Sequence, residues 1–182
     1  ETAVLTEPMA VALHAVNRSD VGRKDVAVVL GCGPVGLAVV LQLKARGVRR
    51  VVASDYSAAR RDLALACGAD AVVDPAQESA YDVAAAAGWK RSAPQVLNHA
   101  LDSMRRLRRL PGWVHLYRAA DALGAADITG PVVFECVGVP GMIEGVVSAA
   151  PIGTRVVVVG VCMGEDRLRP TMAINKEIDL RF

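Results

Sequence analysis

The sequence has few aromatic residues, little net charge and no paired cysteine motif. Aromatic residues make up 4% of the 182 residues, against 53% hydrophobic residues in all, which favours a helix-covered parallel sheet built on Val, Ala and Leu. The absence of any Cys-x-x-Cys pair excludes a zinc ribbon or a thioredoxin-type motif. A formal net charge of +2 is too small to suggest a nucleic-acid-binding protein.

Long apolar runs are also missing. No run approaches the ~20 residues that a membrane-spanning helix needs, and no secretory signal pattern opens the sequence. We therefore expect one cytoplasmic domain with no nucleic-acid partner and no membrane partner. The scattered cysteines are expected to be buried, reduced thiols: Cys32, Cys67, Cys136 and Cys162.

A glycine-rich turn follows the first apolar β-branched run, residues 26–30, and precedes a helical pattern over residues 37–46. It has the form Gly-x-Gly-x-x-Gly, which is typical of dinucleotide-binding folds. Gly31 permits a tight turn, Gly33 lets a pyrophosphate approach the backbone, and Gly36 lets the helix pack closely on the sheet. The helix N-terminus attracts phosphate. Six residues alone are a weak signal, but their position between strand and helix strengthens it.

An acidic residue, Asp55, follows the next apolar run and lies nineteen residues beyond Gly36. In this position a carboxylate binds the adenosine ribose and repels a 2′-phosphate, so NAD is favoured over NADP. The alternative is that Asp55 only caps the helix that starts after Ser57.

Strand and helix patterns alternate along the chain, which predicts an α/β fold: a Rossmann doubly wound parallel sheet of six strands. Residues 1–182 are expected to form a single domain of this kind. The expected strands cover residues 26–30, 50–55, 71–74, 131–136, 155–160 and 178–182, and the expected helices cover residues 7–16, 37–46, 58–67, 82–88, 93–110 and 141–150.

A helical insertion over residues 76–130 separates the third and fourth strands. Residues 93–110 have the periodicity of an amphipathic helix, with arginines gathered mostly on one side. These arginines either bind phosphate or an acidic partner, or form an ordinary solvated helix face. The second interpretation is favoured because no aromatic residues interleave with them.

Several motifs resemble, in order, the nucleotide-binding domain of zinc-type medium-chain alcohol dehydrogenases, near the sorbitol and threonine dehydrogenase branch. The matching stretches are Thr6-Glu-Pro-Met-Ala-Val-Ala-Leu-His-Ala15, Gly31-Cys-Gly-Pro-Val-Gly36, Ser54-Asp55 with Arg60, Gly68-Ala-Asp70, Phe134-Glu-Cys-Val-Gly138, Val159-Gly-Val161 and Asn175-Lys-Glu177. The main departure is the stretch over residues 88–130, where most members cross in fewer residues.

The resemblance implies a cofactor-binding domain of a dehydrogenase that transfers hydride between an alcohol or polyol and NAD. The family's GroES-like catalytic domain, with its zinc ligands, is absent, so no catalytic residue is expected here and the chain alone is expected to be inactive. Zinc belongs only to the intact protein, where Glu7 is a candidate ligand. His14 is expected to be packed. A homodimer or homotetramer is implied.

The cofactor-binding residues implied by the resemblance and by the crevice rule for open sheets lie at strand ends. They are Gly31, Gly33, Pro34, Val35, Gly36, Asp55, Arg60, Cys136, Val137, Gly138, Gly160 and Val161. Arg60 is placed near the adenine by the resemblance, although a plain solvent arginine fits equally. The glycines after the fourth and fifth strands also fit simple turns.

Other function classes fit less well. An S-adenosylmethionine methyltransferase usually has an acidic residue two positions before the first glycine, where this chain has Val29. A short-chain dehydrogenase needs Tyr-x-x-x-Lys, which none of the three tyrosines begins. A non-catalytic NAD-binding module remains an alternative.

Overall fold

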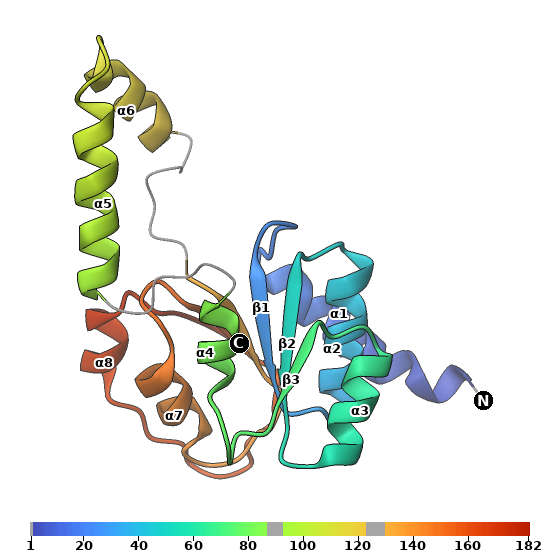
Figure 1. Ribbon diagram of the computed structural model, residues 1–182. Coiled ribbons are helices and arrows are strands. Elements are labelled where there is room, and N and C mark those ends of the chain that lie inside the picture. The colour runs from blue at the N-terminus through green and yellow to red at the C-terminus, as the bar shows by residue number, and fades with distance from the viewer. Residues whose placement is uncertain (1, 87–92, 123–129) are drawn as a thin grey trace.

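The computed structural model describes residues 2–86, 93–122 and 130–182, which form a six-stranded, fully parallel sheet flanked by helices (Figure 1). The strand order is β3-β2-β1-β4-β5-β6, which confirms the predicted doubly wound sheet. Strands β2 and β3 are added on one side of β1, and β4 to β6 on the other side, so the strand order switches between β1 and β4. In such sheets ligands bind at this switch point, outside the carboxyl ends of the strands. The strands are β1 Val26–Leu30, β2 Arg50–Ser54, β3 Ala71–Val73, β4 Val132–Glu135, β5 Arg155–Val158 and β6 Asp179–Arg181.

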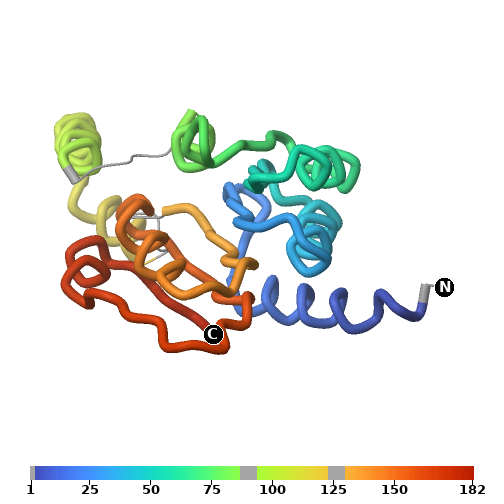
Figure 2. Tube along the Cα trace, turned by 90° about the horizontal axis from the view of Figure 1, so that it is seen from below, coloured from blue at the N-terminus to red at the C-terminus, as the bar shows by residue number. Residues whose placement is uncertain are grey.

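Helices cover both faces of the sheet. One apolar cluster joins the sheet to α1 (Thr6–Arg18), α2 (Pro34–Ala45) and α3 (Ala58–Ala66), and a second joins it to α4 (Ala80–Ala85) and α7 (Met142–Ala149). Figure 2 shows α1 extending outward with the N-terminus at its far end. The remaining helices are the 3-10 helix η1 (Thr2–Leu5), α5 (Ala93–Leu107), α6 (Trp113–Ala122) and α8 (Pro170–Asn175).

The central strands consist almost entirely of buried Val, Ala and Leu. All five residues of β1 and all four of β4 are buried, as expected for strands covered on both faces. Phe134 is the largest fully buried side chain and lies in the cluster beneath α1 and α2. The scarcity of aromatic residues therefore fits a core in which helices lie close to the sheet.

Two helices between β3 and β4 stand away from the sheet. α5 ends at Leu107, three residues earlier than predicted, and the backbone continues to Leu110 in tighter turns. Gly112, with a φ of +71°, then reverses the chain into α6, which the sequence analysis did not predict. The helices η1 and α8 were not predicted either. The helix predicted over residues 82–88 is α4, which begins at Ala80 and ends at Ala85; Gly88 lies outside the described residues.

The fifth strand is shorter than predicted because the backbone turns away from the ladder after Val158. The Val159 and Gly160 N–H groups both donate to the same carbonyl oxygen, that of Glu135, each at 2.8 Å. Residues 159–160 therefore form a turn at the end of β5, next to the end of β4.

Replacing Phe134 with Ala should destabilise the domain by about 3–5 kcal/mol, because a fully buried ring leaves a cavity between sheet and helices. The matched control is Phe182→Ala at the exposed C-terminal ring, expected to cost less than about 0.5 kcal/mol. Urea unfolding followed by circular dichroism measures both. Equal losses would contradict the placement of the core.

Candidate functional site

The turn between β1 and α2 brings backbone atoms into close contact. Gly31 has a φ of +89°, and a Cβ atom there would lie 2.9 Å from a Val137 methyl group and 3.1 Å from the Cys136 carbonyl oxygen. A Cβ atom on Gly36 would lie 1.9 Å from the Gly31 carbonyl oxygen. Side chains are excluded at both positions, so these two glycines allow α2 to start directly against the end of β1.

Gly33 differs from its two neighbours because the space around it is open. No atom lies within 4 Å of the position that its Cβ would take, and its extended backbone suits any residue. It is the N-cap of α2, with Pro34 at the first turn and Val35 behind it. The open space beside a helix N-terminus with free N–H groups suits an anionic group.

Asp55 joins the end of β2 to the glycine turn. One carboxylate oxygen accepts a hydrogen bond from the Cys32 N–H at 2.8 Å, and the other accepts from the Ser57 N–H at 2.8 Å. The side chain is only 9% exposed. Asp55 therefore orients both the glycine turn and the start of α3, so the helix-start role and a ligand role are compatible.

Two adjacent arginines follow Asp55, and they differ in what they contact. Arg60 is largely exposed, with its Nη1 atom 3.8 Å from Asp55 Oδ2. Arg61, which the sequence analysis passed over, donates to the carbonyl oxygens of Asp55 and Tyr56 at 2.7 and 2.8 Å and pairs with Asp74 at 3.3 Å. Arg61 thus stabilises the β2–α3 turn, whereas the Arg60 side chain stays at the surface. The rotation of α3 about its axis determines which of the two arginines faces the turn.

The ends of β4 and β5 meet through two glycines. A Cβ atom on Gly160 would lie 2.3 Å from the Gly138 nitrogen, and one on Gly138 would lie 2.7 Å from the Val161 nitrogen. Gly138 also has a φ of +70°. These glycines are required by the mutual approach of two backbone turns, whatever else the turns do.

Glu135 is a site residue that the sequence analysis did not single out. It is 1% exposed, and its Oε1 atom accepts hydrogen bonds from the Val137 and Gly138 N–H groups at 2.6 and 2.9 Å. The signal was a charged residue inside an otherwise apolar strand, since such a residue is buried only when it is paired. Glu135 shapes the turn that carries Val137 and Gly138.

The cysteines near the site are not suited to nucleophilic chemistry. Burial, reinforced by the Asp55 carboxylate, raises the pKa of the Cys32 thiol to about 12. Burial, with Glu135 beside it, also raises the pKa of the Cys136 thiol. Both remain protonated at neutral pH. All four cysteines are free, but only Cys32 is buried as a whole residue, so the expectation of four buried thiols is wrong for Cys67, Cys136 and Cys162, which are partly exposed. Cys67 and Cys136 pack against the apolar cluster beneath α1 and α2.

Two predicted residues lie on α1. Glu7 is exposed in the first turn of the helix. His14 is exposed as well, which corrects the expectation that it packs: the helix buries the face carrying Ala12, Ala15 and Val16 instead. In the part of the chain that the structure describes, no group of three or more His, Cys, Asp or Glu residues is arranged to hold a metal ion.

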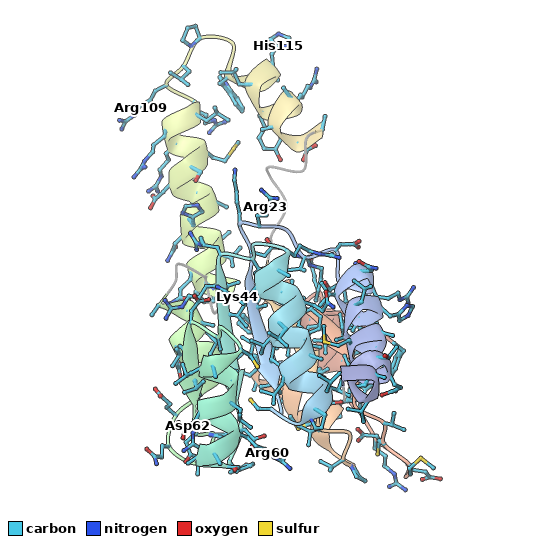
Figure 3. All side chains as sticks on the ribbon, turned by 90° about the vertical axis from the view of Figure 1, so that its right-hand side faces the viewer. Arg23, Lys44, Arg60, Asp62, Arg109 and His115 are labelled. Atoms are coloured by element: carbon cyan, nitrogen blue, oxygen red, sulfur yellow. The ribbon has the colours of Figure 1, made fainter. Side chains whose placement is uncertain are left out.

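Exposed apolar side chains surround the ends of β4 and β5. Val137, Val139, Val161 and Met163 are 43%, 48%, 77% and 93% exposed. They form an apolar rim beside the Gly138–Gly160 contact. The predicted residues after β1, β2, β4 and β5 thus come together along four neighbouring strands, and Figure 3 shows Arg60 at this end of the molecule.

Comparisons with known proteins find similarity to dehydrogenases. A family model described as zinc-binding dehydrogenase matches residues 34–106. The chain is 40% identical over 81 residues to erythritol/L-threitol dehydrogenase of Mycolicibacterium smegmatis, covering 44% of this chain and 22% of that protein. It is 28% identical over 182 residues to L-arabinitol 4-dehydrogenase of Aureobasidium melanogenum, covering 100% and 41%.

A solved structure supports the same fold. The chain superposes on 2R,3R-butanediol dehydrogenase from Bacillus subtilis with a TM-score of 0.64 and 28% identity, covering 97% of this chain and 40% of that one. The chain spans about a fifth to two fifths of the length of the curated relatives it matches.

Replacing Glu135 with Ala should destabilise the domain by about 1–3 kcal/mol, because two part-buried backbone N–H groups lose their shared acceptor. Glu135→Gln keeps an oxygen at that position and should cost less than about 1 kcal/mol. Urea unfolding compares the two with Glu78→Ala, a change at an exposed glutamate. Equal losses for the Ala and Gln variants would mean that the acceptor atom is not what stabilises the turn.

Proposed function

We propose that this chain, which belongs to the zinc-type medium-chain alcohol dehydrogenase family in its sorbitol dehydrogenase-like branch, binds NAD for an enzyme that transfers hydride between an alcohol or polyol and that cofactor. The relatives are named dehydrogenases, but the chain spans less than half of them. The activity, the polyol substrate and the zinc site of the intact protein are therefore part of the proposal.

One observation carries the proposal: an open helix N-terminus, a preorganised carboxylate and an apolar rim occur along one edge of the sheet. Asp55 is tied to the glycine turn through the 2.8 Å hydrogen bond from Cys32, so a ribose on the carboxylate would place its phosphates near Gly33. An extended dinucleotide matches this order along the edge, with a carboxylate for the ribose hydroxyls, an anion-binding helix N-terminus for the phosphates and an apolar rim for the nicotinamide.

Each part of the edge receives a role in this proposal. The turn from Gly31 to Gly36, with Pro34 and Val35 starting the helix, holds the pyrophosphate, and Asp55 accepts hydrogen bonds from the ribose hydroxyls. Arg60 lies beside the adenine half. Val137 and Val161 border the nicotinamide half, and are held there by the turns that Cys136, Gly138 and Gly160 complete. NAD itself supplies the hydride acceptor.

Zinc enters the proposal only for the intact protein. This chain offers Glu7 as a candidate ligand, and an exposed carboxylate in the first turn of α1 is free to face another domain. A single carboxylate is far short of the three protein ligands of a catalytic zinc site. The role of Glu7 stays a prediction from the resemblance.

Assembly and location follow the same resemblance. β6 is an edge strand, with β5 on one side only, and pairing across a two-fold axis would cover it. We include a homodimer or homotetramer and a cytoplasmic location in the proposal. Among the described residues, no helix is long and apolar enough to cross a membrane.

The chain alone should bind NADH and oxidise no substrate, because the residues that would activate an alcohol are not among its own. The measurement combines titration by NADH fluorescence with turnover assays using NAD, zinc and a panel of alcohols and polyols. S-adenosylmethionine serves as the competing ligand. Tighter binding of S-adenosylmethionine than of NADH would favour the methyltransferase alternative, and turnover by the chain alone would overturn its assignment as a cofactor-binding part.

Cofactor choice should depend on Asp55. We expect NADH to bind more tightly than NADPH by about 1–3 kcal/mol, or about 5- to 150-fold, through ribose hydrogen bonds and repulsion of the 2′-phosphate. Asp55→Ser should abolish this preference, since Arg60 then faces the 2′-phosphate without a competing carboxylate. The control is Asp62→Ser, an exposed aspartate on the same helix as Arg60 (Figure 3). Unchanged preference in Asp55→Ser would count against the ribose role.

A further inference from the structure

The junction of α5 and α6 concentrates positive charge. We define the hairpin tip as residues 104–118, which contain five arginines and no acidic residue: Arg105, Arg106, Arg108, Arg109 and Arg118. The whole chain has 21 basic and 19 acidic residues, so the other 167 residues have 16 basic and 19 acidic ones. The tip therefore carries a charge of +5 on a chain that is otherwise −3.

Among the residues that the structure describes, only one of these arginines lies near a carboxylate. Arg105 lies 3.5 Å from Asp102, and Arg108 stacks on Trp113 with its guanidinium carbon 5.3 Å from the ring centroid. Within residues 2–86, 93–122 and 130–182, no carboxylate forms an ion pair with Arg106, Arg109 or Arg118. Within this part of the chain, Arg106, Arg109 and Arg118 therefore have no carboxylate that competes with an anion from outside.

Apolar side chains are exposed beside the arginines. Leu110, Val114, Leu116 and Tyr117 are 50%, 38%, 48% and 38% exposed, and α6 has no buried residue. Along α5, Leu97 and Leu101 are exposed as well. The hairpin therefore presents aliphatic, aromatic and cationic groups together. Such a combination is typical of a surface that contacts another molecule or a membrane rather than water alone.

The tip lies at the opposite end of the molecule from the proposed cofactor site. Figure 3 shows Arg109 and His115 on the projecting hairpin at the top and Arg60 at the bottom, and Figure 1 shows the hairpin standing clear of the sheet. A surface bound by the tip would leave the strand ends accessible.

We propose that the hairpin tip docks the protein on an anionic phospholipid surface. The arginines pair with phosphate groups, while Leu110, Val114 and Trp113 enter the boundary between headgroups and acyl chains. Charge complementarity selects this occupant, because the cytoplasmic leaflet is negatively charged and attracts clustered arginines. The chain would attach to the membrane surface without crossing it. This differs from two expectations of the sequence analysis, that these arginines form a solvated helix face and that the protein has no membrane partner.

Two other occupants fit the tip less well. A second copy joined tip to tip would bring two groups of five arginines together, and such like-charge contact is unfavourable. A nucleic acid would satisfy the arginines but would leave Leu110, Val114 and Leu116 without apolar contacts. An acidic lipid surface satisfies both kinds of side chain.

The first experiment is co-sedimentation of the 182-residue chain with large unilamellar vesicles. Vesicles of phosphatidylcholine with 25% phosphatidylglycerol should bind the chain at least 10-fold more tightly than pure phosphatidylcholine vesicles, and high salt should weaken that binding. In a Trp89→Phe variant, Trp113 is the only tryptophan, and its fluorescence should shift to shorter wavelength on anionic vesicles alone.

The variants test which residues act. Replacing Arg106, Arg109 and Arg118 with Gln should weaken vesicle binding about 100-fold, at about 5-fold per arginine near a charged surface. The matched control replaces Arg23, Lys24 and Arg167, three cations outside the tip, with Gln and should change binding less than threefold. Both variants should keep the circular dichroism spectrum and the urea unfolding midpoint of the unsubstituted chain, which shows that the sheet is folded.

Several results would overturn the proposal: no preference for anionic vesicles, equal losses in the two triple variants, or equally tight binding to duplex DNA. Concentration-dependent dimerisation that the tip variant abolishes would also overturn it, in favour of a second copy. None of these results depends on whether the chain prefers NAD, so failure here and failure of the proposed function are separate outcomes.

Discussion

Backbone segments approach one another at the carboxyl ends of β1, β4 and β5 more closely than any side chain would allow. The Gly31 carbonyl occupies the space of a Gly36 Cβ, and the Gly138 nitrogen occupies that of a Gly160 Cβ. The first contact lies within the β1–α2 turn and the second joins the turns after β4 and β5, so together they set how these turns leave the sheet. The edge at which a cofactor would lie therefore depends first on glycines, which have no Cβ atom, and only then on polar groups.

Two buried carboxylates complete that edge. Asp55 and Glu135 each accept two backbone N–H groups in a turn that follows or adjoins their own strand. A charge-assisted acceptor holding two donors fixes a turn more firmly than a neutral side chain would. The difference between the two is exposure: Asp55 lies at the margin of the site, where a ligand hydroxyl can reach it, whereas Glu135 is enclosed beneath its turn.

The hairpin of α5 and α6 obeys a different constraint. It adds nothing to the two apolar clusters around the sheet, and its own apolar side chains stay partly exposed. In the part of the chain described by the structure, the sheet is complete without it. A segment that carries five arginines and exposed leucines on a finished domain is better explained by an external surface than by folding of the core.

The sequence by itself determined the parallel sheet, its strand positions and the glycine turn, because buried Val-rich runs, glycine spacing and a following acidic residue are local signals. It also pointed to Asp55 and to the residues after β4 and β5. No helix was predicted between Leu110 and the fourth strand, so α6 was missed. His14 was misplaced because the rotation of α1 is set by packing against α2.

Only the tertiary structure decided what each of these residues contacts. The sequence could not distinguish Gly33, which faces open space, from Gly36, which faces a carbonyl, because both are glycines of one motif. Nor could it separate Arg60 from Arg61, or show that Glu135 supports the turn before Gly138. Those differences arise where strands distant in sequence meet, and their distances exist only after the chain has folded.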